Sequence, residues 1–195
     1  MAGHGPALIV MTEMPSISPQ VARFARWVRD AGFTLYVPLL SSTDGAVPDA
    51  QEGEAIMRRA CMGAEFRVFA NKKGANQSSP VTLWLRTLAR LAHAQCGGPG
   101  IGAVGMCFAG NFALAMVLEP AMLAPVLETS PEALIAVKQR LNKENLTVMA
   151  CRFEGDKFCK TERFAAYAQA LGPRFVARIL PDSAANQTGL NSFFE

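Results

Sequence analysis

The feature that most constrains the fold is a regular alternation of short apolar runs and longer segments of helical period. The apolar runs are short and several are rich in β-branched residues, which predicts buried strands at 7–12, 33–40, 101–106, 122–127, 146–153 and 174–180. Segments with helical spacing or helix-start residues separate them, at 18–32, 50–70, 79–96, 108–118, 130–143 and 161–171. Strands joined through helices require right-handed crossovers. The alternation therefore predicts an α/β fold, with a mainly parallel sheet flanked by helices on both faces.

Length and composition agree with one domain of this class. The chain has 195 residues, and half of them are hydrophobic, which supports a full core and argues against disorder. No repeat or linker interrupts it, so we expect a single domain over residues 1–195. The formal net charge is only +3, and the charged residues are scattered, so no nucleic-acid surface is indicated.

The number and spacing of the cysteines, together with the N-terminal residues, indicate the cellular compartment. There are five cysteines, no CxxC spacing and only two histidines, which disfavours a zinc site and a disulfide framework. Reduced thiols are typical of a cytoplasmic protein, and the N-terminus lacks the features of a signal peptide. The uncharged stretch 99–118 is long enough to span a membrane, but its glycines divide it into a strand and a helix. We therefore expect no membrane segment.

The motif GMCFAG at Gly105–Gly110 is the most informative segment for function. It follows an apolar strand and opens a helix, the context of a nucleophile elbow, whose strained turn needs small neighbours such as Gly105 and Ala109. Cys107 would then lie exposed at the carboxyl end of the sheet, where a helix N-terminus favours a thiolate and supplies N–H groups for an oxyanion. The alternative is a buried, inert cysteine. The remaining cysteines have no such context and are interpreted as structural: Cys61, Cys96, Cys151 and Cys159.

Two carboxylates follow predicted strands and are further candidates. Glu13 comes directly after the first strand, so in a parallel sheet it faces the same crevice as Cys107. Asp156 follows a late strand, where the acid of an α/β-hydrolase triad lies, and Glu154 is the alternative acid. An ordinary loop glutamate and a turn aspartate are the alternatives for these two positions.

With these motifs in place, the chain resembles the dienelactone hydrolase family over nearly its whole length. The resemblance maps a cysteine nucleophile onto Cys107, a late acid onto Asp156 and an early glutamate onto Glu13, with an oxyanion hole made by the backbone N–H groups of Met14 and Phe108. The stretches that carry it are ALIVMTEMPSISPQVARFARWVRDAGFTLYVPLL, IGAVGMCFAGNFALAM and TVMACRFEGDKFC.

The resemblance implies an α/β-hydrolase fold and cleavage of a small-molecule ester or lactone through a thioester on the cysteine. It implies no metal and no cofactor, and the sequence itself contains no metal-ligand pattern and no signal for an oligomeric state. The family usually has glycine where this chain has Ala109, which is small enough to preserve the turn.

The chain departs from the family at the triad histidine, which the family places in the loop after the last strand. That loop, 181–195, contains no histidine, and we expect neither His4 nor His93 to reach the thiol. Three explanations stay open: an incomplete sequence, a member that binds without turnover, or a different general base, such as Glu13 or a water.

Two rival interpretations follow from the same residues. One is a non-catalytic binding protein or thiol redox sensor built on the hydrolase fold. The other is a flavodoxin-like fold with a Glu–Cys pair, against which the elbow and the late Gly155-Asp156 pair argue.

Overall fold

The computed structural model describes residues 1–12, 17–40, 51, 55, 58, 79–124, 131–156 and 159–182. The strands are β1 (Ala7–Met11), β2 (Thr34–Tyr36), β3 (Ile101–Gly105), β4 (Met122–Ala124), β5 (Val148–Phe153) and β6 (Phe175–Leu180). The α-helices are α1 (Pro19–Asp30), α3 (Pro80–Cys96), α4 (Gly110–Met116), α5 (Pro131–Lys143) and α6 (Thr161–Leu171). Two single 3₁₀ turns, η2 (Cys107–Ala109) and η3 (Gly172–Arg174), precede α4 and β6.

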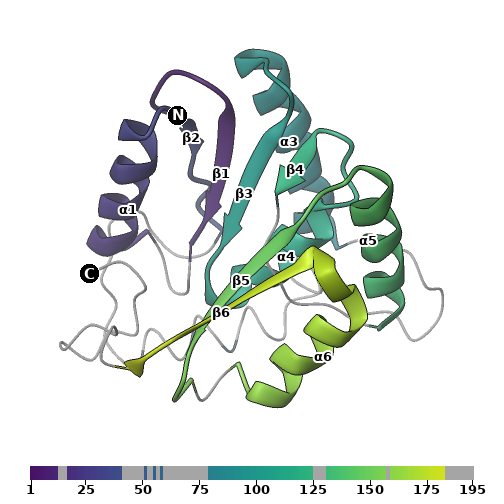
Figure 1. Cartoon of the computed structure of the whole chain (residues 1–195). Helices are drawn as coiled ribbons and strands as arrows, with labels where there is room; N and C mark the ends of the chain where they lie inside the picture. The colour runs from purple at the N-terminus through teal and green to yellow at the C-terminus, as the bar shows by residue number, and fades with distance from the viewer. Residues whose placement is uncertain are drawn as a thin grey trace.

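The strands form two sheets in which every neighbouring strand pair is parallel. One sheet has the order β2-β1-β3-β4, and the other pairs β5 with β6. Met11 lies opposite Gly105 at the end of β1 and β3, and Phe153 lies opposite Leu180 at the end of β5 and β6. The strands of both sheets run in the same direction (Figure 1). The carboxyl ends of the strands therefore lie on one side of the molecule, which we call the carboxyl edge.

Helices cover both faces of the larger sheet, as the alternation predicted. In β1, Ile9 and Met11 belong to a core cluster with residues of α3 and α4. Val10, which points to the opposite face, packs in a cluster with Val21 and Ala25 of α1. Figure 1 shows α1 and α3 on either side of β1 and β3. The period-2 pattern of β1 is thus buried on both faces.

Helix α4 connects the two sheets through its side chains. Its Phe112 and Met116 pack with β1 and β3, whereas its Leu114 belongs to the core cluster of α5, α6, β5 and β6. All three side chains are fully buried. Because α4 follows the single turn η2 that begins at Cys107, the segment that carries the candidate nucleophile is fixed to both halves of the core.

Serine–proline pairs start two of the helices. Ser18 Oγ accepts the N–H of Val21, and Ser79 Oγ accepts the N–H of Thr82, each at 3.2 Å. Each serine satisfies one of the free N–H groups of a first helical turn, and the proline that follows it needs no partner.

Several predicted elements differ in extent from the structure or lie partly outside the described residues, among them the last three residues of the strand predicted over 122–127. The second strand, predicted over 33–40, is limited to Thr34–Tyr36, since Pro38 lacks the N–H that a longer ladder needs. The predicted helix at 108–118 is divided into η2 and α4. Of the helix predicted at 50–70, residues 51, 55 and 58 are helical and the rest lies outside the described residues. Among the described helices, none is both long and apolar enough to cross a membrane.

Candidate active site at the carboxyl edge

Cys107 occupies a strained turn directly after β3. The N–H of Met106 donates to the carbonyl of Met11 at 3.1 Å, which extends the β1–β3 ladder by one residue. The backbone of Cys107 then turns with φ = 51°, a left-handed conformation that is unusual for a residue with a side chain. Such strain is found most often at functional sites. The side chain of Cys107 is exposed.

Close packing of the turn explains why position 105 is a glycine. A Cβ atom on Gly105 would lie 2.7 Å from the carbonyl carbon of Ala109 and 2.8 Å from the Cα of Gly110. Real Cβ atoms essentially never approach other atoms this closely. The chain after Cys107 therefore folds back over Gly105, and a larger residue would push the turn away from the strand.

The backbone after Cys107 presents an N–H group at the carboxyl edge. The N–H groups of Ala109 and Gly110 are used inside the turn, where they donate to the carbonyls of Met106 and Cys107. Phe108 is the second residue of η2, in the first turn of a helical segment, where N–H groups have no partner within the helix. This is the Phe108 N–H that the family resemblance assigns to an oxyanion hole, and that role stays a prediction.

Glu13 and Met14 lie outside the described residues. The chain before them is described up to Thr12, which is buried and follows β1. Strand β1 is the direct neighbour of β3. The topology therefore starts the Glu13 segment from the strand beside that of Cys107, and the roles of Glu13 and Met14 stay predictions.

Asp156 follows β5 at the same edge, and its carboxylate binds its own loop. Its Oδ1 accepts the N–H of Cys159 at 2.9 Å, and its own N–H donates to the carbonyl of Phe153 at 3.3 Å. Asp156 is half-buried, whereas the alternative acid, Glu154, is exposed. The carboxylate of Asp156 is thus anchored to its own loop through Oδ1.

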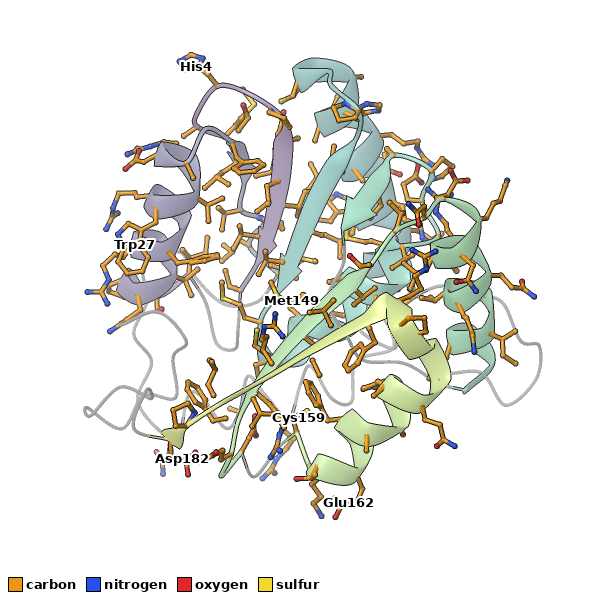
Figure 2. All side chains as sticks on the ribbon, viewed as in Figure 1. His4, Trp27, Met149, Cys159, Glu162 and Asp182 are labelled. Carbon is orange, nitrogen blue, oxygen red and sulfur yellow. The ribbon has the colours of Figure 1, made fainter. Side chains whose placement is uncertain are left out.

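Asp182 ties the loop after β6 to the loop after β5. Its Oδ1 accepts the N–H of Gly155 at 2.8 Å, and a Cβ on Gly155 would lie 2.6 Å from its Oδ2. Figure 2 shows Asp182 and Cys159 at the end of the molecule opposite His4. Sequence analysis did not single out Asp182, because the pairing of β5 with β6 brings it to Gly155 from 27 residues away.

Arg152 is a second residue that sequence analysis missed. It is only 3% exposed, and its guanidinium donates three hydrogen bonds to the segment 154–161 around Asp156. A signal was present in β5, where Val148, Ala150 and Arg152 alternate with exposed residues and form its buried side. An arginine at such a position needs buried partners.

The remaining described cysteines lie in different surroundings from Cys107. Cys96 and Cys159 are half-buried, and Cys151 is exposed on β5, whereas Cys61 lies outside the described residues. Burial raises the pKa of the Cys159 thiol, the Asp156 carboxylate raises it further, and Arg152 opposes this. Partial burial also raises the pKa of the Cys151 thiol, against the effect of Arg178.

Both histidines of the sequence lie at the opposite edge of the sheet. His93 is in the last turn of α3, before the turn that leads into β3, and its half-buried ring has Nε2 3.1 Å from the carbonyl oxygen of Gly98. His4 precedes β1. Strand β3 has five residues and spans about 16 Å. Neither imidazole is therefore within hydrogen-bonding distance of Cys107. Within the described part of the chain, no group of three or more potential ligands is arranged to hold a metal ion.

The fold and the family follow from comparison with known proteins. The structure matches solved α/β hydrolases, and the protein has an α/β-hydrolase fold. A family model described as the dienelactone hydrolase family matches residues 1–177, so the chain belongs to that family. The resemblance seen in the sequence is thereby confirmed. No curated protein matches the sequence.

Three solved structures illustrate the likeness. A candidate dienelactone hydrolase from Klebsiella pneumoniae is 16% identical, with a TM-score of 0.58 over 93% of this chain and 75% of that chain. The dienelactone hydrolase-like promiscuous phosphotriesterase P91 from metagenomic libraries is 15% identical, with a TM-score of 0.56 over 93% and 72%. An alpha-beta serine hydrolase homologue from Coxiella burnetii is 11% identical, with a TM-score of 0.55 over 92% and 77%. At these identities the likeness establishes the fold alone. The family suggests a small-molecule substrate.

Proposed function

We propose that the protein hydrolyses a small carboxylic ester or lactone, with Cys107 as the nucleophile and a thioester as the intermediate. The observation that supports this best is the strained, exposed Cys107 at φ = 51° between β3 and α4. A cysteine that served only packing would be buried in a relaxed conformation. Membership of a hydrolase family supports the same chemistry.

The reaction follows from the groups at the carboxyl edge. The thiol of Cys107 loses its proton, and the sulfur attacks the ester carbonyl carbon to form a tetrahedral oxyanion, which the N–H of Phe108 stabilises. The carbon–oxygen bond to the leaving group then breaks, and the alcohol departs with a proton. Water attacks the thioester that remains, which releases the carboxylic acid and restores the thiol. The second oxyanion N–H is assigned to Met14.

This chain differs from its family in the group that accepts the proton. With His4 and His93 at the far edge, the proton acceptor within the chain is a carboxylate, Asp156 or Glu13, or a water that it orients. Losing a positioned histidine base costs roughly 10²- to 10⁴-fold in rate. A thiol suffers less than a hydroxyl because some thiolate exists at neutral pH without a base. We therefore expect deacylation, in which water must be activated, to be slower than acylation.

The test is time-resolved hydrolysis of 4-nitrophenyl acetate, with intact-mass detection of the acyl-enzyme. The wild-type protein should release nitrophenolate in a burst followed by slow steady turnover, while an acetyl adduct accumulates. Cys107→Ala should abolish the burst, the adduct and the turnover. Cys107→Ser should retain little activity, because the hydroxyl is not ionised near neutral pH.

Cys151→Ala is the matched control, since Cys151 is an exposed cysteine outside the elbow. This variant should keep both the burst and the turnover. Acylation that disappears in Cys151→Ala and survives in Cys107→Ala would identify ordinary surface-thiol chemistry. A single stoichiometric adduct without turnover, or no adduct at all, would contradict the hydrolase proposal and favour the binding or redox-sensing alternative.

A further inference from the structure

The most unusual buried group outside the elbow is the guanidinium of Arg152. It lies on the buried side of β5, and the residue is 3% exposed. Within the described part of the chain, no carboxylate forms an ion pair with it. Its three described hydrogen bonds go instead to neutral oxygen atoms.

The three hydrogen bonds of Arg152 span the loop between β5 and α6. Nη2 donates to the carbonyl of Glu154 at 3.1 Å, at the start of the loop. Nε donates to the carbonyl of Cys159 at 2.9 Å, and Nη1 donates to Oγ1 of Thr161, the first residue of α6, at 3.1 Å. One rigid planar group therefore fixes both ends of the loop that contains Asp156.

Cys159 connects this guanidinium to the carboxylate of Asp156. Its carbonyl oxygen accepts from Arg152, and its N–H donates to Oδ1 of Asp156 at 2.9 Å. Burial raises the pKa of the Cys159 thiol, the Asp156 carboxylate raises it further, and Arg152 lowers it. The backbone of Cys159 therefore links Arg152 to Asp156, because it is hydrogen-bonded to both.

The chemistry of arginine suits this arrangement. A guanidinium offers donors in a fixed planar fork, whereas the ammonium of lysine is a point charge on a flexible stem and cannot reach three separated acceptors in the same way. Burying a cation is unfavourable unless its hydrogen bonds are made, so displacement of any one acceptor is resisted by the other two. The two ends of the loop, at Glu154 and at Cys159 and Thr161, are therefore held in place relative to each other.

We propose that Arg152 is a positioning residue for Asp156: its buried guanidinium holds both ends of the β5–α6 loop and so fixes the carboxylate at the carboxyl edge. This inference rests on the proposed function, in which Asp156 accepts or directs the proton of the reaction. Arg152 acts through Cys159 and the loop and does not contact the substrate.

The experiment combines a readout that needs no activity with one that does. Amide hydrogen exchange of the whole protein is measured in Arg152→Lys, and Arg174→Lys serves as the control. Arg174 also donates two hydrogen bonds, to Asn142 and Asn145, but at the amino end of β6. Arg152→Lys should speed exchange of the Cys159 amide by about tenfold or more, and Arg174→Lys should leave that amide unchanged.

The second readout is the rate of Cys107 acylation in a double-mutant cycle of Arg152→Lys and Asp156→Ala. Each single variant should slow acylation by about 10- to 100-fold, as expected when a reacting group is displaced. The double variant should be no slower than Asp156→Ala alone, because Arg152 acts through Asp156. If Arg152→Lys does not fold, Thr161→Val replaces it in both arms, since it removes one acceptor only.

The possible outcomes distinguish failure of this inference from failure of the proposed function on which it rests. Unchanged exchange of the Cys159 amide in Arg152→Lys overturns the inference. So does a loss of acylation that is equally large in the Asp156→Ala background, which would mark a purely structural arginine. If the wild-type protein forms no acyl adduct, the proposed function fails, and the exchange arm alone decides whether Arg152 holds the Asp156 loop.

Discussion

Replacement of Gly105 by alanine tests the geometry on which the proposed site depends. The added Cβ would lie 2.7 Å from the carbonyl carbon of Ala109 and 2.8 Å from the Cα of Gly110, both backbone atoms of the turn. Ordinary contact begins at 3.4 Å. The carbonyl oxygen of Ala109 lies closer still, so the turn must move by at least about 0.7 Å, and the backbone cannot relieve the clash by rotating a side chain.

We expect this movement to lower both the stability of the fold and the rate of Cys107 acylation. Overpacking in a well-packed region costs about 1–3 kcal/mol, so the free energy of unfolding should fall by that amount. A displacement approaching 1 Å at a reacting group costs up to about 100-fold in rate, so acylation of Cys107 should slow by about 10- to 100-fold. Urea denaturation measures the first effect, and burst kinetics with mass detection measure the second.

Gly102→Ala in the same strand is the matched control. There the new Cβ would meet the tip of the Leu8 side chain, with Cδ1 at 3.1 Å and Cγ at 3.6 Å, and a rotamer adjustment relieves the contact. Removing a glycine from a strand also favours folding by about 0.5–1 kcal/mol, so this variant should be close to neutral. Equal stability and equal acylation in Gly105→Ala and Gly102→Ala would refute the reasoning. A loss of stability in Gly105→Ala without slower acylation would show that the turn is structural and that Cys107 does not depend on it.

Two further predictions concern other parts of the chain. The Asp156 carboxylate raises the pKa of the Cys159 thiol, so Asp156→Asn should lower that pKa and speed alkylation of Cys159 by iodoacetamide between pH 7 and pH 9. Mass-resolved labelling rates measure this effect, and an unchanged or slower rate would contradict it. Ser79→Ala should reduce the free energy of unfolding by about 1 kcal/mol, because the Ser79 hydroxyl accepts the N–H of Thr82 at the start of α3. Urea denaturation measures this change, and a loss below about 0.3 kcal/mol would show that the cap contributes little.

The parts of the fold that were predictable from the sequence are those set by local chemistry. Ser18 and Ser79 cap the helices that follow them, because a hydroxyl one residue before a proline satisfies the first helical turn. Gly105 was recognised from its place between an apolar strand and Cys107, and the close approach of Ala109 is the reason for it. Family membership, inferred from the same segments, was confirmed over residues 1–177.

The parts that were not predictable depend on contacts between distant segments. Asp182 and Gly155 are 27 residues apart and meet because β5 pairs with β6. Arg152 meets Cys159 and Thr161 because the chain turns back between β5 and α6. A local sequence pattern does not predict such contacts between distant segments. The buried position of Arg152 in an alternating strand does indicate that buried acceptors exist.

The positions of the histidines bear on the choice of a cysteine as the proposed nucleophile. A serine hydroxyl at the elbow would need a base within hydrogen-bonding distance, and both histidines of this sequence lie across the sheet from that point. A thiol needs the base less, because a few per cent of it is ionised near pH 7. Water in the second half of the reaction has no such advantage, so its activation depends on a carboxylate at the carboxyl edge. The orientation of the Asp156 carboxylate by Cys159, whose carbonyl oxygen accepts from Arg152, therefore bears on deacylation as well as on acylation.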